Sequence, residues 1–136
     1  MTYILVADDD ELLAELVRRR LCAAGHEVVT VDNGQECLAM VQQRRPDLIL
    51  LDAMMPVMDG ISTLHTLKDD TSWCTIPVIM MTARRSQEDV LTALRAGAAD
   101  YMTKPFSPED LALRVEGLLA SKRFTADTLP QRQSIH

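Results

Sequence analysis

The chain alternates between short, continuous apolar runs and segments with a helical period. Four apolar runs, at residues 4–7, 48–51, 78–81 and 101–103, predict buried strands, and a fifth strand is predicted at residues 26–31. Strands that are apolar on both sides and are separated by helices are typical of a parallel sheet covered on both faces. This pattern predicts an α/β fold.

Five helical segments lie between and after these strands. Their expected ranges are residues 10–24, 33–45, 60–69, 86–96 and 107–120. Capping residues mark their starts and glycines mark two of their ends. The start signals are Asp10, Asn33 with Glu36, Asp59-Gly60, Ser86 with Asp89, and Ser107-Pro108, and the stop signals are Gly25 and Gly97. Five strands alternating with five helices predict a flavodoxin-like, doubly wound parallel sheet with strand order 2-1-3-4-5.

Composition limits the class of protein. The chain has 136 residues, of which 47% are apolar, enough for one compact domain with its own core. Its net charge of −6 argues against direct nucleic-acid binding, which needs clustered Lys and Arg to neutralise phosphates. Cys22, Cys37 and Cys74 have no pairing or metal-binding spacing and are expected to be free thiols. No signal-peptide pattern or membrane-length apolar stretch is present in the sequence, so a cytoplasmic protein is expected.

The apolar periodicity stops near the C-terminus. Residues 1–120 are predicted to form the domain, and residues 121–136 a polar tail or the start of a linker. Met1 fits a native start, and the sequence is compatible both with a stand-alone protein and with the front of a longer one.

Polar residues end four of the predicted strands. Asp8 and Asp9 follow the first, Asp52 the third, Thr82 the fourth and Lys104 the fifth. Because ligand chemistry in an open parallel sheet gathers at the carboxyl ends of the strands, these side chains are expected to meet. Three carboxylates, one hydroxyl and one ammonium predict a metal and phosphoryl site.

Each residue type in this set suits a particular role. Asp52 can act as a carboxylate nucleophile toward a phosphoryl group, and positive charge is needed for two anions to approach each other. Mg²⁺, with Mn²⁺ as an alternative, suits such a site because it prefers oxygen ligands and keeps several waters. Asp9 and Asp52 are the expected direct ligands, and Asp8 a ligand through water. Thr82 can donate its hydroxyl to a phosphoryl oxygen, and Lys104 can pair with the phosphate.

Taken together, these motifs resemble the receiver domain of two-component response regulators over residues 3–120. The resemblance includes Asp8-Asp9, Asp52 followed by Met55-Pro56 and Asp59-Gly60, Thr82-Ala83, and Lys104-Pro105-Phe106. The separations of Thr82 and Lys104 from Asp52 are similar to those in the chemotaxis receiver. The resemblance implies phosphorylation of Asp52 by a histidine kinase or a histidine phosphotransfer protein, followed by slow loss of the phosphoryl group. It implies a signalling switch that acts on a downstream protein or a fused output domain, and not an enzyme.

The resemblance also assigns roles to further residues. It implies phosphoryl binding by Thr82, Ala83 and Lys104, a metal contact from the Met54 carbonyl, and a cis Lys104-Pro105 bond. It places Thr82 and Tyr101 at switch positions and Met54 and Arg84 at positions that tune phosphoryl lifetime. Neither Met54 nor Arg84 is a good water-orienting acceptor, so a long-lived phosphoryl group is expected.

Three charged residues resemble part of the dimer face of DNA-binding response regulators. They are Asp100, Asp110 and Arg114, on the predicted fifth strand and last helix. Ala99 stands where many of those proteins have a second acid, which puts a symmetric dimer in doubt. We expect phosphorylation-dependent association through helix four, strand five and helix five, with a partner or a second copy.

The same residues are also compatible with different roles. Asp8 and Asp9 could serve only as acids at the start of the first helix, and Tyr101 could simply pack in the core. An aspartyl-phosphate phosphatase of the haloacid dehalogenase kind needs a second acid two residues after the nucleophile, where this chain has Met54. A degenerate receiver used as a scaffold should have lost one of the acids, the threonine or the lysine. A flavin carrier would need a phosphate cradle that the loops do not suggest. His26, His65 and His136 have no partner at catalytic spacing.

Overall fold

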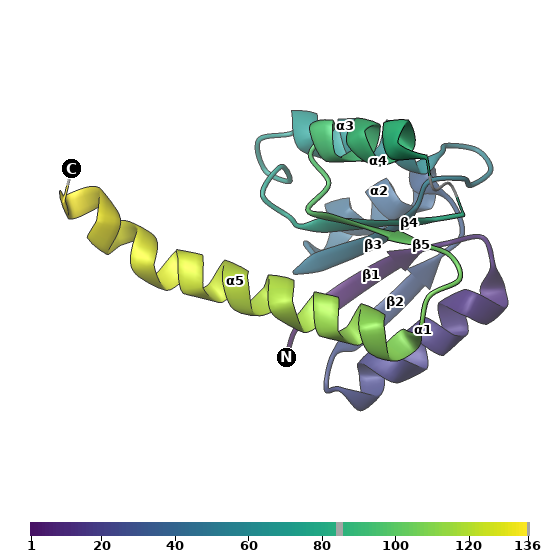
Figure 1. The fold of residues 1–136 in the computed structure, drawn as a ribbon, viewed down its shortest axis with the longest axis horizontal. Helices are drawn as coiled ribbons and strands as arrows, with labels where there is room; N and C mark the ends of the chain where they lie inside the picture. Colours follow the sequence, from purple (N-terminus) through teal and green to yellow (C-terminus); the bar gives the residue numbers. More distant parts are fainter. Residues whose placement is uncertain (84–85, 136) are drawn as a thin grey trace.

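The computed structural model describes residues 1–83 and 86–135, with side chains as far as Ser121. The elements follow one another as β1 (Tyr3–Ala7), α1 (Glu11–Ala23), β2 (Glu27–Val31), α2 (Gly34–Gln43), β3 (Leu48–Asp52), α3 (Gly60–Asp69), β4 (Val78–Thr82), α4 (Gln87–Arg95), β5 (Asp100–Thr103) and α5 (Pro108–Ile135). All strand pairs are parallel, in the order β2-β1-β3-β4-β5 (Figure 1). The predicted flavodoxin-like fold is therefore confirmed.

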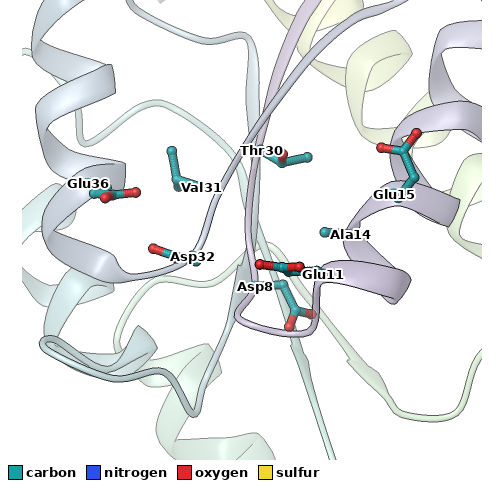
Figure 2. Close-up of a pocket in the computed structure, with 8 residues that line it drawn as sticks. All are labelled: Asp8, Glu11, Ala14, Glu15, Thr30, Val31, Asp32 and Glu36. Carbon is teal, nitrogen blue, oxygen red and sulfur yellow. The ribbon is translucent and has the colours of Figure 1, made fainter.

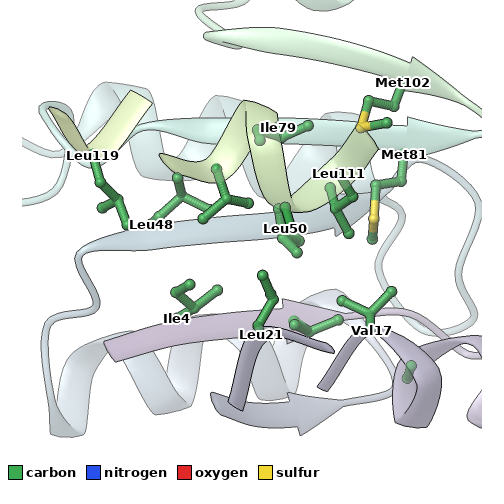
Figure 3. Close-up of a cluster of buried hydrophobic side chains, with 14 residues drawn as sticks. Ile4, Val17, Leu21, Leu48, Leu50, Ile79, Met81, Met102, Leu111 and Leu119 are labelled. Carbon is green, nitrogen blue, oxygen red and sulfur yellow. The ribbon is translucent and has the colours of Figure 1, made fainter. Parts of the chain in front are cut away.

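Both faces of the sheet are buried, which explains why the strands are apolar at nearly every position. Successive side chains of a strand point to opposite faces. One set packs against α1 and α5, as Figure 3 shows, and includes Ile4, Val6, Leu48, Leu50, Ile79 and Met81. The other set packs against α2, α3 and α4, and includes Leu5, Ala7, Ile49, Leu51, Val78 and Met80. Two layers of helices thus cover the sheet, one on each face (Figure 1).

The predicted capping residues begin their helices in the structure. The side chains of Asp10, Asn33, Asp59, Ser86 and Ser107 each accept a hydrogen bond from a backbone N–H three residues later. These bonds satisfy N–H groups that the first turn of a helix leaves without partners.

Boundaries at the second strand differ by one residue from the prediction. The prediction began this strand at His26, whereas β2 begins at Glu27. The backbone N–H of His26 donates to the Leu21 carbonyl at 3.2 Å, so it still belongs to the turn that ends α1. Gly25 makes this turn with a φ of 97°, a left-handed conformation that favours glycine.

The last helix is longer than the apolar periodicity indicates. The structure continues α5 to Ile135, through the segment expected to be a polar tail, and Figure 1 shows this end leading away from the sheet. Among the described side chains of α5, Leu119 is the last that is buried in the core. Apolar periodicity reports burial against the sheet, whereas a helix needs only its internal hydrogen bonds, so periodicity ended before the helix did. The boundary between domain and linker near residue 120 stays a prediction.

None of the described helices is both long enough and apolar enough to cross a membrane.

Candidate functional site

Four strands end at one edge of the sheet and bring the candidate residues together. Asp8 follows β1, Asp52 ends β3, Thr82 ends β4 and Lys104 follows β5. The backbone N–H of Lys104 donates to the Thr82 carbonyl at 2.8 Å, which ties the ends of β4 and β5 to each other. The Lys104-Pro105 bond is cis, as predicted.

Three carboxylates form a cluster at this edge. One oxygen each from Asp8, Asp9 and Asp52 can be chosen so that all lie within 4.8 Å of one another. Asp8 and Asp52 are buried and Asp9 is exposed, so the cluster opens to solvent on one side. A compact set of oxygen ligands with room for water suits Mg²⁺, which keeps part of its hydration shell. The chemistry of these residues therefore fits the expected ion.

Asp8 is fixed from two sides. Its Oδ1 accepts the backbone N–H of Asp10 at 2.9 Å, and its Oδ2 accepts from Lys104 Nζ at 2.8 Å. Lys104 Nζ lies farther from Asp52 Oδ2, at 3.3 Å. The lysine thus pairs more closely with Asp8 than with the expected nucleophile, a preference that the sequence did not reveal.

Asp52 is held in an environment that disfavours its charge. Burial, and then the charge of Asp8, raise the pKa of Asp52 from 3.8 to about 6, against the opposing effects of the Met54 N–H and Lys104. The Met54 N–H donates to Asp52 Oδ1 at 3.2 Å. For Lys104, burial alone would lower the pKa, but its pairing with Asp8 and Asp52 raises it above its ordinary value. Lys104 is therefore a cation at neutral pH and partly neutralises the acids.

An acidic pocket of about 340 Å³ borders Asp8 (Figure 2). It lies between the start of α1 and the segment that joins β2 to α2, and its lining acids are Asp8, Glu11, Glu15, Asp32 and Glu36. The surrounding negative charge raises the local concentration of cations near the three clustered carboxylates.

The remaining candidate site residues differ in how exposed they are. Thr82 is fully buried at the end of β4, and Ala83 follows it in an exposed position. Met54 contributes its backbone N–H to Asp52 while its side chain is exposed. Arg84 lies outside the described residues, so its expected effect on phosphoryl lifetime stays a prediction.

Gly60 shapes the site through its close approach to Asp52, whereas in the sequence Asp59-Gly60 predicts mainly the start of a helix. A Cβ at Gly60 would lie 2.1 Å from the Asp52 carbonyl oxygen, so a side chain here would displace the backbone of Asp52. The Gly60 N–H also donates to the Ala53 carbonyl at 3.0 Å. The glycine that follows Asp59 is the only mark of this role in the sequence. Its close approach to Asp52 is visible only in the three-dimensional structure.

Comparison with known proteins agrees with this geometry. Residues 4–116 match the sequence profile of the response regulator receiver domain. The chain belongs to the response regulator receiver family. Its membership makes it a signalling module of two-component systems, with an acidic cluster consistent with the metal site of a receiver.

Individual relatives match most of this chain but are longer than it. The probable transcriptional regulatory protein TcrX of Mycobacterium tuberculosis is 40% identical over 116 residues, which are 85% of this chain and 49% of TcrX. The phosphate regulon transcriptional regulatory protein PhoB of Pseudomonas aeruginosa is also 40% identical over 116 residues, 85% of this chain and 51% of PhoB. The chain spans about half the length of these curated relatives.

Among solved structures, chemotaxis protein CheY4 of Vibrio cholerae aligns with a TM-score of 0.81 at 33% identity, covering 85% of this chain and 97% of CheY4. NtrX of Brucella abortus aligns with a TM-score of 0.87 at 30% identity, covering 96% of this chain and 30% of NtrX. The receiver fold is therefore shared with both a protein of similar length and a much longer one.

Tyr101 of this receiver lies half-buried on β5. It lines a cavity of about 100 Å³ together with Ala53, Asp59, Ile61, Asp89 and Thr92. The tyrosine also packs against the core layer under α2, α3 and α4. Space beside Tyr101 is compatible with a change of its rotamer, and its role as a switch stays a prediction.

The three charged residues of the expected interaction face lie together on this receiver. Arg114 Nη1 is 3.1 Å from both carboxylate oxygens of Asp100, and Arg114 Nε is 3.5 Å from Asp110 Oδ2. The structure thus pairs these side chains within one chain.

His26 has partners that its spacing in the sequence did not indicate. Its Nδ1 is hydrogen-bonded to Thr2 Oγ1, and its Nε2 to Glu116 Oε1 on α5. These contacts join the start of β2 to α5 at the end of the sheet away from the acids, which indicates a structural role. The three cysteines are free thiols, as predicted.

Proposed function

We propose that this receiver accepts a phosphoryl group on Asp52 from the phosphohistidine of a histidine kinase or a histidine phosphotransfer protein. One observation carries the proposal. Asp52 is a buried carboxylate that has Asp8 and Asp9 within 4.8 Å and Lys104 Nζ at 3.3 Å. A site with both a negative cluster for a metal ion and a cation for the phosphate suits phosphoryl transfer, which depends on positioning and charge.

The acids would hold the ion. Asp9 and Asp52 would be direct ligands, Asp8 a ligand through water, and the Met54 carbonyl a fourth contact. Bound Mg²⁺, or Mn²⁺ in its place, would supply the positive charge that lets the Asp52 carboxylate approach a phosphoryl group.

The protein's own side chains would carry out the transfer. An oxygen of Asp52 attacks phosphorus, and the bond from phosphorus to the donor imidazole breaks with its electron pair left on nitrogen. Thr82 donates its hydroxyl hydrogen to one phosphoryl oxygen. Lys104 exchanges its contacts with Asp8 and Asp52 for an ion pair with a second phosphoryl oxygen. The Ala83 N–H is an additional donor at the same strand end. Water later attacks phosphorus, the bond from phosphorus to the Asp52 oxygen breaks, and inorganic phosphate leaves, which returns the receiver to its starting state.

The donor would dock beside Lys104. An apolar pocket of about 480 Å³ lies there, lined by Asp10, Leu12, Leu13, Leu16, Ala83, Lys104, Pro105 and Phe106. Leu12 and Leu16 on α1 are 73% and 48% exposed. Exposed apolar surface next to a reactive group indicates a protein partner.

The signal would pass to a downstream protein or a fused output domain. TcrX and PhoB are named as transcriptional regulatory proteins, and both are about twice as long as the part that matches. With a net charge of −6, this domain itself would not contact nucleic acid. We also propose that the domain lies in the cytoplasm, where a histidine kinase presents its phosphorylated domain, and that it acts as a switch that modifies itself.

A direct test uses acetyl phosphate as a small donor. The intact mass should increase by one phosphoryl group in the presence of Mg²⁺ and stay unchanged in EDTA, because the carboxylates repel the donor without an ion. Mass spectrometry at neutral pH measures this change. Equal uptake with and without Mg²⁺ would show that the acidic cluster is not a metal-dependent acceptor.

The phosphoryl group is expected to be long-lived. The Met54→Asn/Arg84→Glu variant should lose phosphate about tenfold faster than wild type, a barrier difference of about 1.4 kcal/mol, because amide and carboxylate groups can orient the attacking water. Loss of acid-labile phosphate after removal of the donor gives the rate. Equal rates would refute the assignment of these two positions.

Phosphorylation is expected to alter the surface formed by α4, β5 and α5. Thr82 would move toward the phosphoryl group and Tyr101 would turn into the vacated space. Sedimentation with and without beryllofluoride, a phosphoryl mimic, should show association of wild type and not of Tyr101→Ala. If activated wild type remains monomeric, self-association is wrong. Backbone amide hydrogen exchange with and without beryllofluoride tests the face itself. If none of the changes in exchange falls within residues 86–115, the assignment of the interaction face is wrong.

A further inference from the structure

Val57 has a backbone conformation that its side chain disfavours. It is the one residue other than glycine with a positive φ, 69°, among residues 1–83 and 86–135. A β-branched residue is a genuine outlier in this region, because its Cβ substituents crowd the backbone. The Met58 N–H donates to the Pro56 carbonyl at 2.7 Å, which closes a tight γ-turn around Val57.

The loop that carries Val57 is fixed at both its neck and its tip. The neck is the bond from the Gly60 N–H to the Ala53 carbonyl, next to Asp52. The tip is held by the Gly34 N–H, which donates to the Met58 carbonyl at 3.1 Å. Because both ties use backbone groups, the strain at Val57 cannot relax without loss of hydrogen bonds.

The conformation keeps the Val57 side chain in solvent. Val57 is 76% exposed and belongs to neither of the two core layers. Strain together with exposed apolar surface destabilises the free protein. Strained backbone of this kind persists mainly where function uses it.

Position indicates what that use is. The loop begins directly after Asp52 and leads to α3, on one face of the sheet, whereas the apolar pocket at Leu12 and Leu16 lies beside α1, on the other face. A donor domain that places its histidine over Asp52 would lie across the ends of the strands. It would then reach toward this loop on one side and toward the pocket on the other.

We propose that Val57 is a specificity-determining contact for the protein that donates the phosphoryl group. The occupant is the helical phosphotransfer domain of a histidine kinase, with an apolar side chain near its phosphohistidine packed on Val57. This inference depends on the proposed function of Asp52. Acetyl phosphate brings no protein surface to pack on Val57, so it separates the phosphoryl-transfer chemistry from the docking of a protein donor.

The test compares two donors on four proteins: wild type, Val57→Thr, Val57→Gly and Val57→Ile. The protein donor is the phosphorylated kinase core that transfers fastest among those encoded in the same genome. Val57→Thr keeps the shape and removes the apolar surface. Val57→Gly removes the side chain together with the strain. Val57→Ile keeps a β-branched apolar side chain and serves as the matched control.

With the kinase core, kcat/KM should fall about tenfold for Val57→Thr and Val57→Gly, through KM, while Val57→Ile stays close to wild type. All four should react equally fast with acetyl phosphate. Val57→Gly should also unfold at a higher temperature, so that its loss of transfer cannot come from unfolding. Unchanged transfer in Val57→Thr and Val57→Gly would overturn the proposal, and so would an equal decrease with both donors. A wild-type receiver that acetyl phosphate does not label would refute the proposed function instead.

Discussion

The Asp52→Asn variant is expected to take up no phosphoryl group from acetyl phosphate in the presence of Mg²⁺. An amide oxygen is a poor nucleophile, and the change also removes a predicted metal ligand, so the reaction should fall at least about a hundredfold below wild type. Acid-labile phosphate on the intact protein, measured by mass spectrometry, gives the result.

Asp69→Asn is the matched control for this variant. Asp69 is an exposed carboxylate at the end of α3, and it should be dispensable for labelling. Acid-labile phosphate that persists undiminished on Asp52→Asn would mean that another side chain is the acceptor. In that case the burial and charge around Asp52 would have a purely structural origin.

A second large effect concerns stability without metal. The folded protein raises the pKa of Asp52 from 3.8 to about 6, through burial and the nearby charge of Asp8. As pH rises between these values, the unfolded chain loses its proton first, so ionisation favours unfolding. Wild type should therefore lose stability relative to Asp52→Asn across this range, and the variant should be more stable by about 2 kcal/mol at pH 8.

Urea denaturation in EDTA at pH 8 and at pH 4 measures this difference. The gap between the two proteins should be near its full size at pH 8 and should nearly close at pH 4, where Asp52 is protonated in the folded state. Mg²⁺ should then stabilise wild type more than the variant, because an ion bound only by the folded protein shifts the equilibrium by mass action. A variant that is less stable than wild type at pH 8 would contradict the account of the buried charge.

The fold could be predicted because each of its elements is encoded locally. Apolar runs such as residues 48–51 report strands buried on both faces, and the capping side chains of Asn33 and Ser107 mark helix starts. The helical extension of α5 was missed because those residues lack the apolar stripe that burial against a sheet produces.

The sequence predicts which residues meet at the site, but not which of them pair most closely with one another. Strand ends bring Asp8, Asp52 and Lys104 to one edge whatever the details of packing. That Lys104 lies closer to Asp8 than to Asp52 depends on tenths of an ångström in side-chain placement. No pattern in the sequence reports such a difference.

The strained turn at Val57 was invisible for another reason. Glycine, asparagine and aspartate are the residues that usually adopt a positive φ, whereas valine predicts a negative φ. The conformation is imposed by hydrogen bonds from Gly34 and Met58, which are distant or unremarkable in the sequence. The sequence does not predict this conformation because the local preference of valine and the tertiary contacts disagree.

Arg114 already has both of its acidic neighbours as partners within one chain. An ion pair from Arg114 to a second copy would therefore exchange one carboxylate for another, and exchanges between exposed pairs yield little net free energy. Affinity for a second copy would have to come from apolar contacts such as those of Leu91 and Leu94 on α4, which are 42% and 43% exposed. Assembly through this face would then respond weakly to ionic strength, and its charges would select the orientation of the two copies more than the strength of their contact.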